Sequence, residues 1–138
     1  MNRKFKLIEH PADIGIEVFG KTIEELFKNS SYALFKIMDI SSIGEKQEKT
    51  IKFSLSADTL EELLVRFLNE LIYIAQVKNK YGKVDIKLTK KQNTYELKCF
   101  LQGNCIKKIG REIKSTTYHN LEIKKEREFY KCSIIFDL

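Results

Sequence analysis

Acidic residues near the two ends of the chain are the first candidates for chemistry. Asp13 follows Pro11, the only proline, and precedes an apolar run, so its carboxylate lies at the entrance of an expected strand. Asp137 ends another apolar run and is followed directly by the α-carboxylate of Leu138. Negative groups this close repel unless a cation lies between them, and hard oxygen ligands favour Ca²⁺ or Mg²⁺. If Asp13 approaches Asp137 in the fold, three acidic groups would converge on one divalent-metal site.

Both aspartates also have simpler interpretations. Asp13 could cap a tight turn by accepting hydrogen bonds from nearby backbone N–H groups. Asp137 could form an ion pair with a lysine, since the chain carries 25 Lys and Arg residues. The residues alone leave the metal site and these alternatives open.

A second candidate segment, from Lys114 to His119, reads KSTTYH. A lysine beside several hydroxyl groups could bind a phosphate or a nucleotide, although the glycines of a P-loop are missing. The alternative is a polar entrance to a strand. His10 and His119 are the only histidines of the chain, and a metal site built from both would need a further ligand. No catalytic Ser/His/Asp or Cys/His set stands out by spacing.

The hydrophobic pattern places these residues on an α+β fold. Two amphipathic helices are expected to begin at Thr22 and Thr59, each with a glutamate three residues later as in a capping box. The similarity of KTIEELF (21–27) to DTLEELL (58–64) fits a strand–helix duplication or convergent helix-start chemistry equally well. Strands are expected over residues 5–8, 14–19, 50–55, 84–88, 95–101, 118–123 and 129–136, with turns or loops at 10–13, 39–47, 91–94, 103–104 and 124–128.

These elements predict a single domain over residues 1–138. Its architecture would be a two-layer sandwich, with two helices on a mainly antiparallel or mixed sheet of six to seven strands. The formal charge of +6 fits RNA or another anionic partner, but it also fits a solvated lysine-rich face.

The cysteine content and hydropathy indicate the compartment. The chain has three cysteines without metal-ligand spacing, which suits a reducing cytosol and predicts a cytoplasmic protein. Cys99 and Cys132 lie in apolar runs and are interpreted as small core residues. No apolar run reaches the roughly 18 residues of a membrane span, so neither a transmembrane helix nor a signal peptide is expected.

Four segments, in this order, resemble the archease family. They cover residues 9–38 (EHPADIGIEVFGKTIEELFKNSSYALFKIM), 59–76 (TLEELLVRFLNELIYIAQ), 113–123 (IKSTTYHNLEI) and 134–138 (IIFDL). The first resembles the family's opening His-x-Ala-Asp-x-Gly strand and helix, the third its Lys-x-x-Thr-Tyr-His segment, and the last its ending in Phe-Asp plus an aliphatic residue. The resemblance spans nearly the whole chain.

The resemblance implies an accessory protein rather than an enzyme. Archeases support an RNA-splicing ligase of the RtcB type in tRNA splicing, by promoting ligase guanylylation and turnover in the presence of GTP and Mn²⁺. The fold implied is an α+β sandwich that contains a strand–helix–strand–strand module. The alternative is an RNA-binding or chaperone module for a tRNA-modifying enzyme such as a methyltransferase, with tRNA or that enzyme as partner.

The resemblance also assigns roles to particular residues. Asp13 and Asp137 would bind a divalent metal, of which Ca²⁺ is expected and Mg²⁺ or Mn²⁺ are alternatives, and Leu138 would contribute oxygens. Lys114 matches a lysine needed for activation of the ligase. His10 and His119 fall within the matching motifs and are candidates for activation or partner contact, although His119 could instead order the strand entrance.

Overall fold

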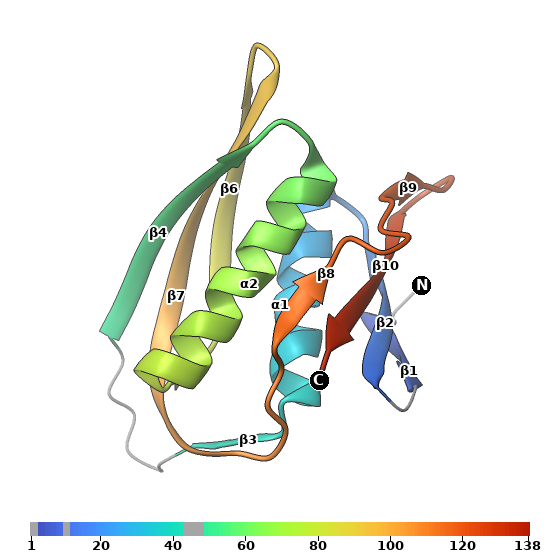
Figure 1. Cartoon of the computed structure of the whole chain (residues 1–138). Coiled ribbons are helices and arrows are strands. Elements are labelled where there is room, and N and C mark those ends of the chain that lie inside the picture. Colours follow the sequence, from blue (N-terminus) through green and yellow to red (C-terminus); the bar gives the residue numbers. More distant parts are fainter. Residues whose placement is uncertain (1–2, 10–11, 43–48) are drawn as a thin grey trace.

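The computed structural model describes residues 3–9, 12–42 and 49–138 of the chain. Figure 1 shows the two helices and the strands that surround them. In chain order the elements are β1 (Phe5–Glu9), β2 (Asp13–Gly20), α1 (Ile23–Ile37), β3 (Ile40–Ser42), β4 (Lys49–Ala57), α2 (Leu60–Lys78), β5 (Lys80–Tyr81), β6 (Val84–Lys91), β7 (Thr94–Ile109), β8 (Ser115–Thr117), β9 (Lys124–Lys125) and β10 (Tyr130–Asp137).

The strands form two antiparallel sheets with the helices between them. One sheet has the order β1-β2-β10-β8, with β9 also on β10, and in the other β7 pairs with β3, β4, β5 and β6. Helix α1 contacts β2 and β6, and α2 contacts β4 and β8, so each helix touches both sheets (Figure 1). The predicted α+β class with two amphipathic helices is confirmed. The strands divide into two sheets because both helices are apolar on more than one side. A sheet on each side of the helices buries these apolar surfaces.

Threonine caps start both helices as predicted. The Thr22 hydroxyl accepts a hydrogen bond from the Glu25 N–H at 3.0 Å, and the Thr59 hydroxyl accepts one from the Glu62 N–H at 3.1 Å. Each bond satisfies one of the free donors in the first helical turn. The rings of Phe27 in α1 and Phe67 in α2 have centroids 5.7 Å apart, and both side chains are fully buried. The apolar faces of the helices therefore form one core between the sheets.

The turn predicted at Gly103-Asn104 is wrong, because β7 runs through it. The partners of β7 change at this point: Gly103 is the last residue opposite β4, and Asn104 pairs with β5. A Cβ atom on Gly103 would lie 2.7 Å from the Lys49 carbonyl oxygen, so glycine permits a close approach of β4. The Gly-Asn pair marks a change of partner strand and does not end the strand.

The strand predicted over 118–123 is also wrong. The strand in this region is β8, which precedes it, and residues 118–123 form an irregular segment whose Ile123 N–H donates to Glu61 of α2 at 3.0 Å. Two predicted loops each contain a short strand, β3 within 39–47 and β9 within 124–128. Such short polar strands lack the alternation that identifies a half-buried strand. Residues 43–48, and residues 10–11 of the turn predicted at 10–13, lie outside the described residues.

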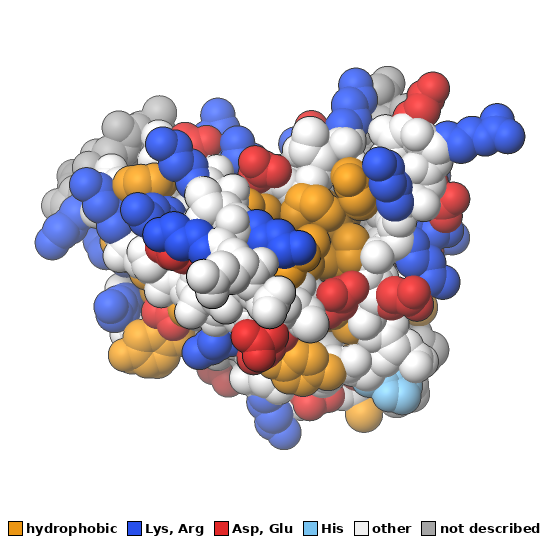
Figure 2. All heavy atoms as spheres, turned by 90° about the horizontal axis from the view of Figure 1, so that it is seen from above, with side chains coloured by type: hydrophobic (Ala, Val, Ile, Leu, Met, Phe, Trp, Pro, Cys, Tyr) orange, Lys and Arg blue, Asp and Glu red, His pale blue; other side chains and the backbone are white. Residues whose placement is uncertain are grey.

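Basic side chains are spread widely over the surface. Figure 2, seen from above, shows Lys and Arg side chains around much of this face and hydrophobic side chains in a hollow between its two halves. The positive charge on this face is therefore distributed and forms no single large patch. Neither helix among the described residues is long and apolar enough to cross a membrane.

Candidate metal centre

Asp13 and Asp137 are brought together by the pairing of β2 with β10. Asp13 is the first residue of β2, Asp137 is the last of β10, and they are directly opposite in the register. On the other side of β10, Asp137 is opposite Ser115, the first residue of β8. Opposed residues of antiparallel strands project to the same face with Cβ atoms about 4.5–5.5 Å apart. Two carboxylates and a hydroxyl therefore form one row across the sheet.

The neighbouring residues fix this row on the face that points away from the helices. Ile14 and Phe136 are opposite each other and have 1% and 0% of their surface exposed. Because successive side chains of a strand alternate between the two faces, Asp13 and Asp137 must project to the other side. A slip of one residue would expose Ile14 and Phe136, so the hydrophobic core enforces the meeting of the two acids.

One carboxylate oxygen of Asp13 has no partner in the described part of the protein. Its Oδ1 atom is buried and accepts no hydrogen bond from residues 3–9, 12–42 or 49–138. An unpaired buried oxygen is costly, and in native proteins such an atom is normally satisfied by a donor, a water molecule or an ion. Neither Asp13 nor Asp137 forms an ion pair with the side chains that the structure describes. Turn capping by Asp13 and a lysine partner for Asp137 therefore find no support within the described ranges.

The donor set at this row fits a hard cation. It consists of the two carboxylates and the Ser115 hydroxyl, and Leu138, which carries further main-chain oxygens, directly follows Asp137 in the chain and is 36% exposed. Ca²⁺ and Mg²⁺ bind through oxygen atoms of this kind. Among the described residues no group of three or more His, Cys, Asp or Glu side chains is arranged for metal binding. A cation here would thus depend on Asp13, Asp137 and oxygens other than those of a third acidic side chain.

The backbone of Lys114 is held at the same end of these strands. Its backbone N–H donates to the carbonyl oxygen of Asp137 at 2.8 Å, directly before β8 begins. Its side chain is exposed and forms no ion pair with either aspartate. Three of the predicted site residues, Asp13, Lys114 and Asp137, therefore lie together, although they come from distant parts of the sequence.

Two polar residues of α2, which the sequence analysis did not single out, hold the Lys114 segment in place. The side-chain oxygen of Asn69 accepts from the Thr116 N–H at 2.7 Å, and that of Gln76 accepts from the Ile113 N–H at 2.8 Å. These bonds provide acceptors for backbone N–H groups of β8 and of the residues before it, on the side where no described strand pairs with β8. The signal in the sequence is the presence of two amides two helical turns apart within an otherwise apolar helix face.

The histidines are not brought to this row by the described structure. His119 lies in the turn after β8, beyond Thr117 and therefore at the opposite end of the strand from Ser115, and its backbone N–H donates to the Thr117 hydroxyl at 3.4 Å. Its Nε2 lies 3.3 Å from the side-chain nitrogen of Asn120, and the residue is exposed. The strand expected over 118–123, whose entrance His119 could have ordered, is absent from this described segment, so a role of His119 in activation or partner contact stays a prediction. His10 lies outside the described residues.

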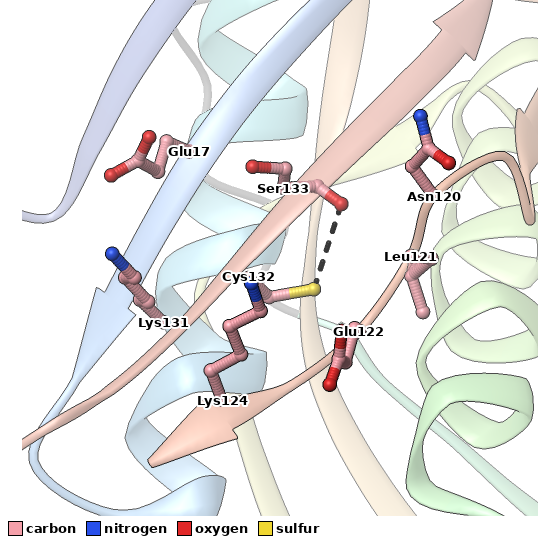
Figure 3. A pocket seen from close by; sticks show the side chains of 8 residues that line it. All are labelled: Glu17, Asn120, Leu121, Glu122, Lys124, Lys131, Cys132 and Ser133. Atoms are coloured by element: carbon pink, nitrogen blue, oxygen red, sulfur yellow. Dashed lines mark hydrogen bonds between the residues drawn. The ribbon is translucent and has the colours of Figure 1, made fainter. Parts of the chain in front are cut away.

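A separate cavity of about 420 Å³ lies between β10 and the segment 120–124 (Figure 3). Glu17, Glu122, Lys124 and Lys131 contribute charges of both signs to its lining, and Cys132 lies among them. Burial, and secondarily the charge of Glu61, raises the pKa of the Cys132 thiol to about 12. The thiol is therefore protonated at neutral pH and is a poor nucleophile, which agrees with the prediction that Cys132 is a core residue.

Comparison with known proteins identifies the family. Residues 5–138 match the model of the Archease protein family (MTH1598/TM1083). The chain is 32% identical to protein archease of Thermoplasma acidophilum, over 97% of this chain and 93% of that protein. It is 33% identical to protein archease of Pyrococcus furiosus, over 89% of each.

Solved structures agree in fold. The solution structure of Methanobacterium thermoautotrophicum protein 1598 matches with a TM-score of 0.79 and 26% identity, covering 98% of this chain and 99% of that chain. The crystal structure of the Thermotoga maritima archease TM1083, described as a possible chaperone, matches with a TM-score of 0.66 and 27% identity, over 96% of each chain. The family model, the curated relatives and these two structures agree along nearly the whole length, and the chain belongs to the archease family.

Proposed function

We propose that this protein is a non-catalytic activator of an RNA-splicing ligase of the RtcB type, which promotes ligase guanylylation and turnover in tRNA splicing. Membership of the archease family supports this role. The observation that carries it is that Asp13, Lys114 and Asp137 lie together at one end of the neighbouring strands β2, β10 and β8. The three residues come from three of the segments that resemble the family, 9–38, 113–123 and 134–138. The fold therefore brings one charged residue from each of these segments to one place on the protein.

The acidic row would hold a divalent cation, with Ca²⁺ the expected ion and Mg²⁺ or Mn²⁺ the alternatives. Asp13 and Asp137 would supply carboxylate oxygens, and Leu138 a main-chain oxygen. When bound, the ion would neutralise the two facing carboxylates. The contribution of the chain is to hold both acids in a fixed register, so that the end of β10 presents a defined shape and charge to the ligase.

Lys114 would supply the positive charge of the activating surface. Its exposed side chain starts one residue before Ser115, which is opposite Asp137. A lysine ammonium is a flexible point charge that suits contact with a phosphate of the ligase-bound nucleotide or with a carboxylate of the ligase. In either case, removal of the charge should impair activation while the fold remains, because the side chain is not part of the core.

The test is single-turnover guanylylation of the cognate ligase in GTP and Mn²⁺, with and without this protein. We expect a clear acceleration that falls at least about tenfold with Asp137→Asn or Lys114→Ala. The matched control for the aspartate is Glu17→Gln, which removes the same charge from the same face of β2. Lys107→Ala, at an exposed position of β7, is the control for the lysine. Full stimulation by both Asp13→Asn and Asp137→Asn would contradict the role of the acidic row.

A second candidate function is an RNA-binding or chaperone module for a tRNA-modifying enzyme such as a methyltransferase. The formal charge of +6 favours it, as does a lysine-lined groove along α1. A protein of this kind would change the solubility or activity of the methyltransferase on tRNA without affecting ligase guanylylation. Measuring both activities with the same preparation separates the two candidates.

A further inference from the structure

A groove of about 860 Å³ lies between α1 and the segment that joins β5 to β6. We call it the α1 groove. Its aromatic lining comprises Tyr32, Phe35 and Tyr81, and its charged lining comprises Lys4, Lys28, Lys36, Lys83, Asp39 and Asp85. It shares no lining residue with the acidic row, so it is a separate site. Its volume lies within the roughly 300–1,000 Å³ that is usual for ligand sites.

An exposed tyrosine, Tyr32, lines the α1 groove. Tyr32 is 43% exposed, although eight of the fifteen residues of α1 are buried. The Phe5 ring meets it edge to face, with centroids 6.3 Å apart, which holds the Tyr32 ring in position. The ammonium groups of Lys4 and Lys36 lie 4.3 and 5.4 Å from the centre of this ring. An aromatic surface is thus offered to solvent together with two positive charges.

The charges of the α1 groove are predominantly positive. Four lysines line it against two aspartates, and one of these aspartates, Asp85, is paired with Lys28 at 3.2 Å. Lys4, Lys36 and Lys83 remain exposed. Exposed lysines attract a polyanion and release its counterions on contact with phosphates. The complementary ligand is therefore a chain of negative charges spaced along the groove.

We infer that the α1 groove binds a single-stranded segment of RNA, with one base stacked on Tyr32 and phosphates on the lysines around it. Non-specific single-strand sites combine these two features, an aromatic platform and a basic track. A base can replace the Lys4 ammonium over the ring, because stacking of a base is stronger than a cation–π contact at an exposed site. The displaced ammonium then remains within reach of a phosphate.

Other polyanions fit the α1 groove less well. The bases of a duplex are stacked on one another, so a duplex has no free base face for Tyr32. An acidic peptide would meet the lysines, but it has no flat aromatic surface to cover the ring. The choice of RNA over DNA rests on the proposed function, since both candidate partners act on RNA. The groove itself is argued from the positions of Tyr32 and its lysines alone.

The first experiment measures binding of a fluorescein-labelled oligouridylate to the full chain by fluorescence anisotropy at low salt. Tyr32→Leu should weaken binding about tenfold, while Tyr32→Phe, which keeps the ring, should stay within about twofold of the unchanged protein. The matched control is Tyr73→Leu. Tyr73 is 48% exposed on α2 and has Lys78 5.7 Å from its ring centre, but it does not line the groove.

The second experiment repeats the titration over a range of salt concentrations. For single strands the logarithm of the affinity falls with the logarithm of salt by about 0.7 for each phosphate contact. Replacing Lys36 and Lys83 together by glutamine should therefore reduce the slope by roughly 1.4. The control double variant replaces Lys87 and Lys98, exposed residues opposite each other on β6 and β7, and should leave the slope unchanged.

Three results would overturn the assignment. The first is equal binding by the Tyr32→Leu and Tyr73→Leu variants, which would exclude stacking in the groove. The others are equally tight binding of a duplex RNA of the same length, or of a poly-glutamate peptide, which would leave charge alone as the cause. The binding assays contain no ligase, so a negative result in them does not bear on the proposed activation. Activation is measured separately, by the guanylylation of the ligase with the Asp13 and Asp137 variants.

Discussion

Asp13, the first residue of β2, lies directly opposite Asp137, the last residue of β10. Neither has an ion-pair partner among the described side chains. Like charges directly opposite in a sheet are destabilising. The buried neighbours Ile14 and Phe136 prevent the register from shifting to relieve this repulsion. The fold therefore holds an unfavourable charge pair that only a change of charge or a bound cation can relieve.

Without a metal, the Asp137→Asn variant should be more stable than the unchanged protein. The asparagine side chain has nearly the same shape as the aspartate but no charge, so the repulsion with Asp13 disappears. We expect the melting temperature in EDTA at pH 7 to rise by about 1–3 °C. Glu17→Gln serves as the control, because Glu17 is on the same face of β2 but is opposite Ser133. An unchanged or lower melting temperature for Asp137→Asn would show that the two carboxylates do not repel in the folded state.

With calcium present, the order of stability should reverse. A ligand at about a hundredfold over its Kd stabilises the folded state by about 2.7 kcal/mol, which corresponds to a rise of roughly 5–10 °C for a chain of this size. Asp13→Asn and Asp137→Asn should lose this rise, while Glu17→Gln should keep it. Thermal scans in EDTA and in Ca²⁺ give the result directly, and Mg²⁺ and Mn²⁺ in the same series identify the preferred ion. A rise of equal size in both aspartate variants would place the metal elsewhere.

The hydrogen bonds from the side chains of Asn69 and Gln76 in α2 should control the position of Lys114. Asn69→Ala leaves the Thr116 N–H without its acceptor, at a cost of about 1–3 kcal/mol if the group stays buried. We expect faster hydrogen exchange at the Thr116 amide and weaker stimulation of the ligase, although Lys114 itself is unchanged. Asn69→Asp keeps an acceptor oxygen at the same place and should restore both properties. Slow exchange of the Thr116 amide in Asn69→Ala would show that the bond to Asn69 is not needed to hold this segment in place.

The sequence was sufficient for the parts of the fold that repeat a simple pattern. The helix starts at Thr22 and Thr59 were predicted because a cap and an apolar period are both local signals. The β2 and β10 strands were predicted from their alternation. The short strands β3, β5, β8 and β9 were missed, because their pairing depends on the partner strand and two or three mostly polar residues carry no alternation that predicts it.

The candidate site was predictable in its members but not in its geometry. Asp13, Lys114 and Asp137 stood out by type and by resemblance, yet only the register of β2, β10 and β8 shows that they meet. Asn69 and Gln76 were missed because an amide on a helix has no visible purpose until the strand edge that it covers is known. Contacts between distant segments thus account for most of what the sequence left open.

The buried thiols predict a loss of stability at high pH. Burial, and secondarily Asp85, raises the pKa of Cys99 to about 12, and burial with Glu61 does the same for Cys132. In the unfolded chain these thiols lose their protons near pH 9. Above that pH the unfolded state binds fewer protons than the folded state, so their contribution to stability is complete below pH 9 and is lost as pH rises towards 12.

The measurement is the free energy of unfolding in urea at several pH values from 8 to 11. The Cys99→Ala/Cys132→Ala double variant lacks both thiols, so its stability should decline less steeply above pH 9 than that of the unchanged protein, even though its stability at pH 7 is lower because of the cavities created. Cys105→Ala, which alters a partly exposed position of β7, should retain the steeper decline. Parallel curves for the double variant and the unchanged protein would mean that the two thiols ionise as readily in the folded core as in the unfolded chain.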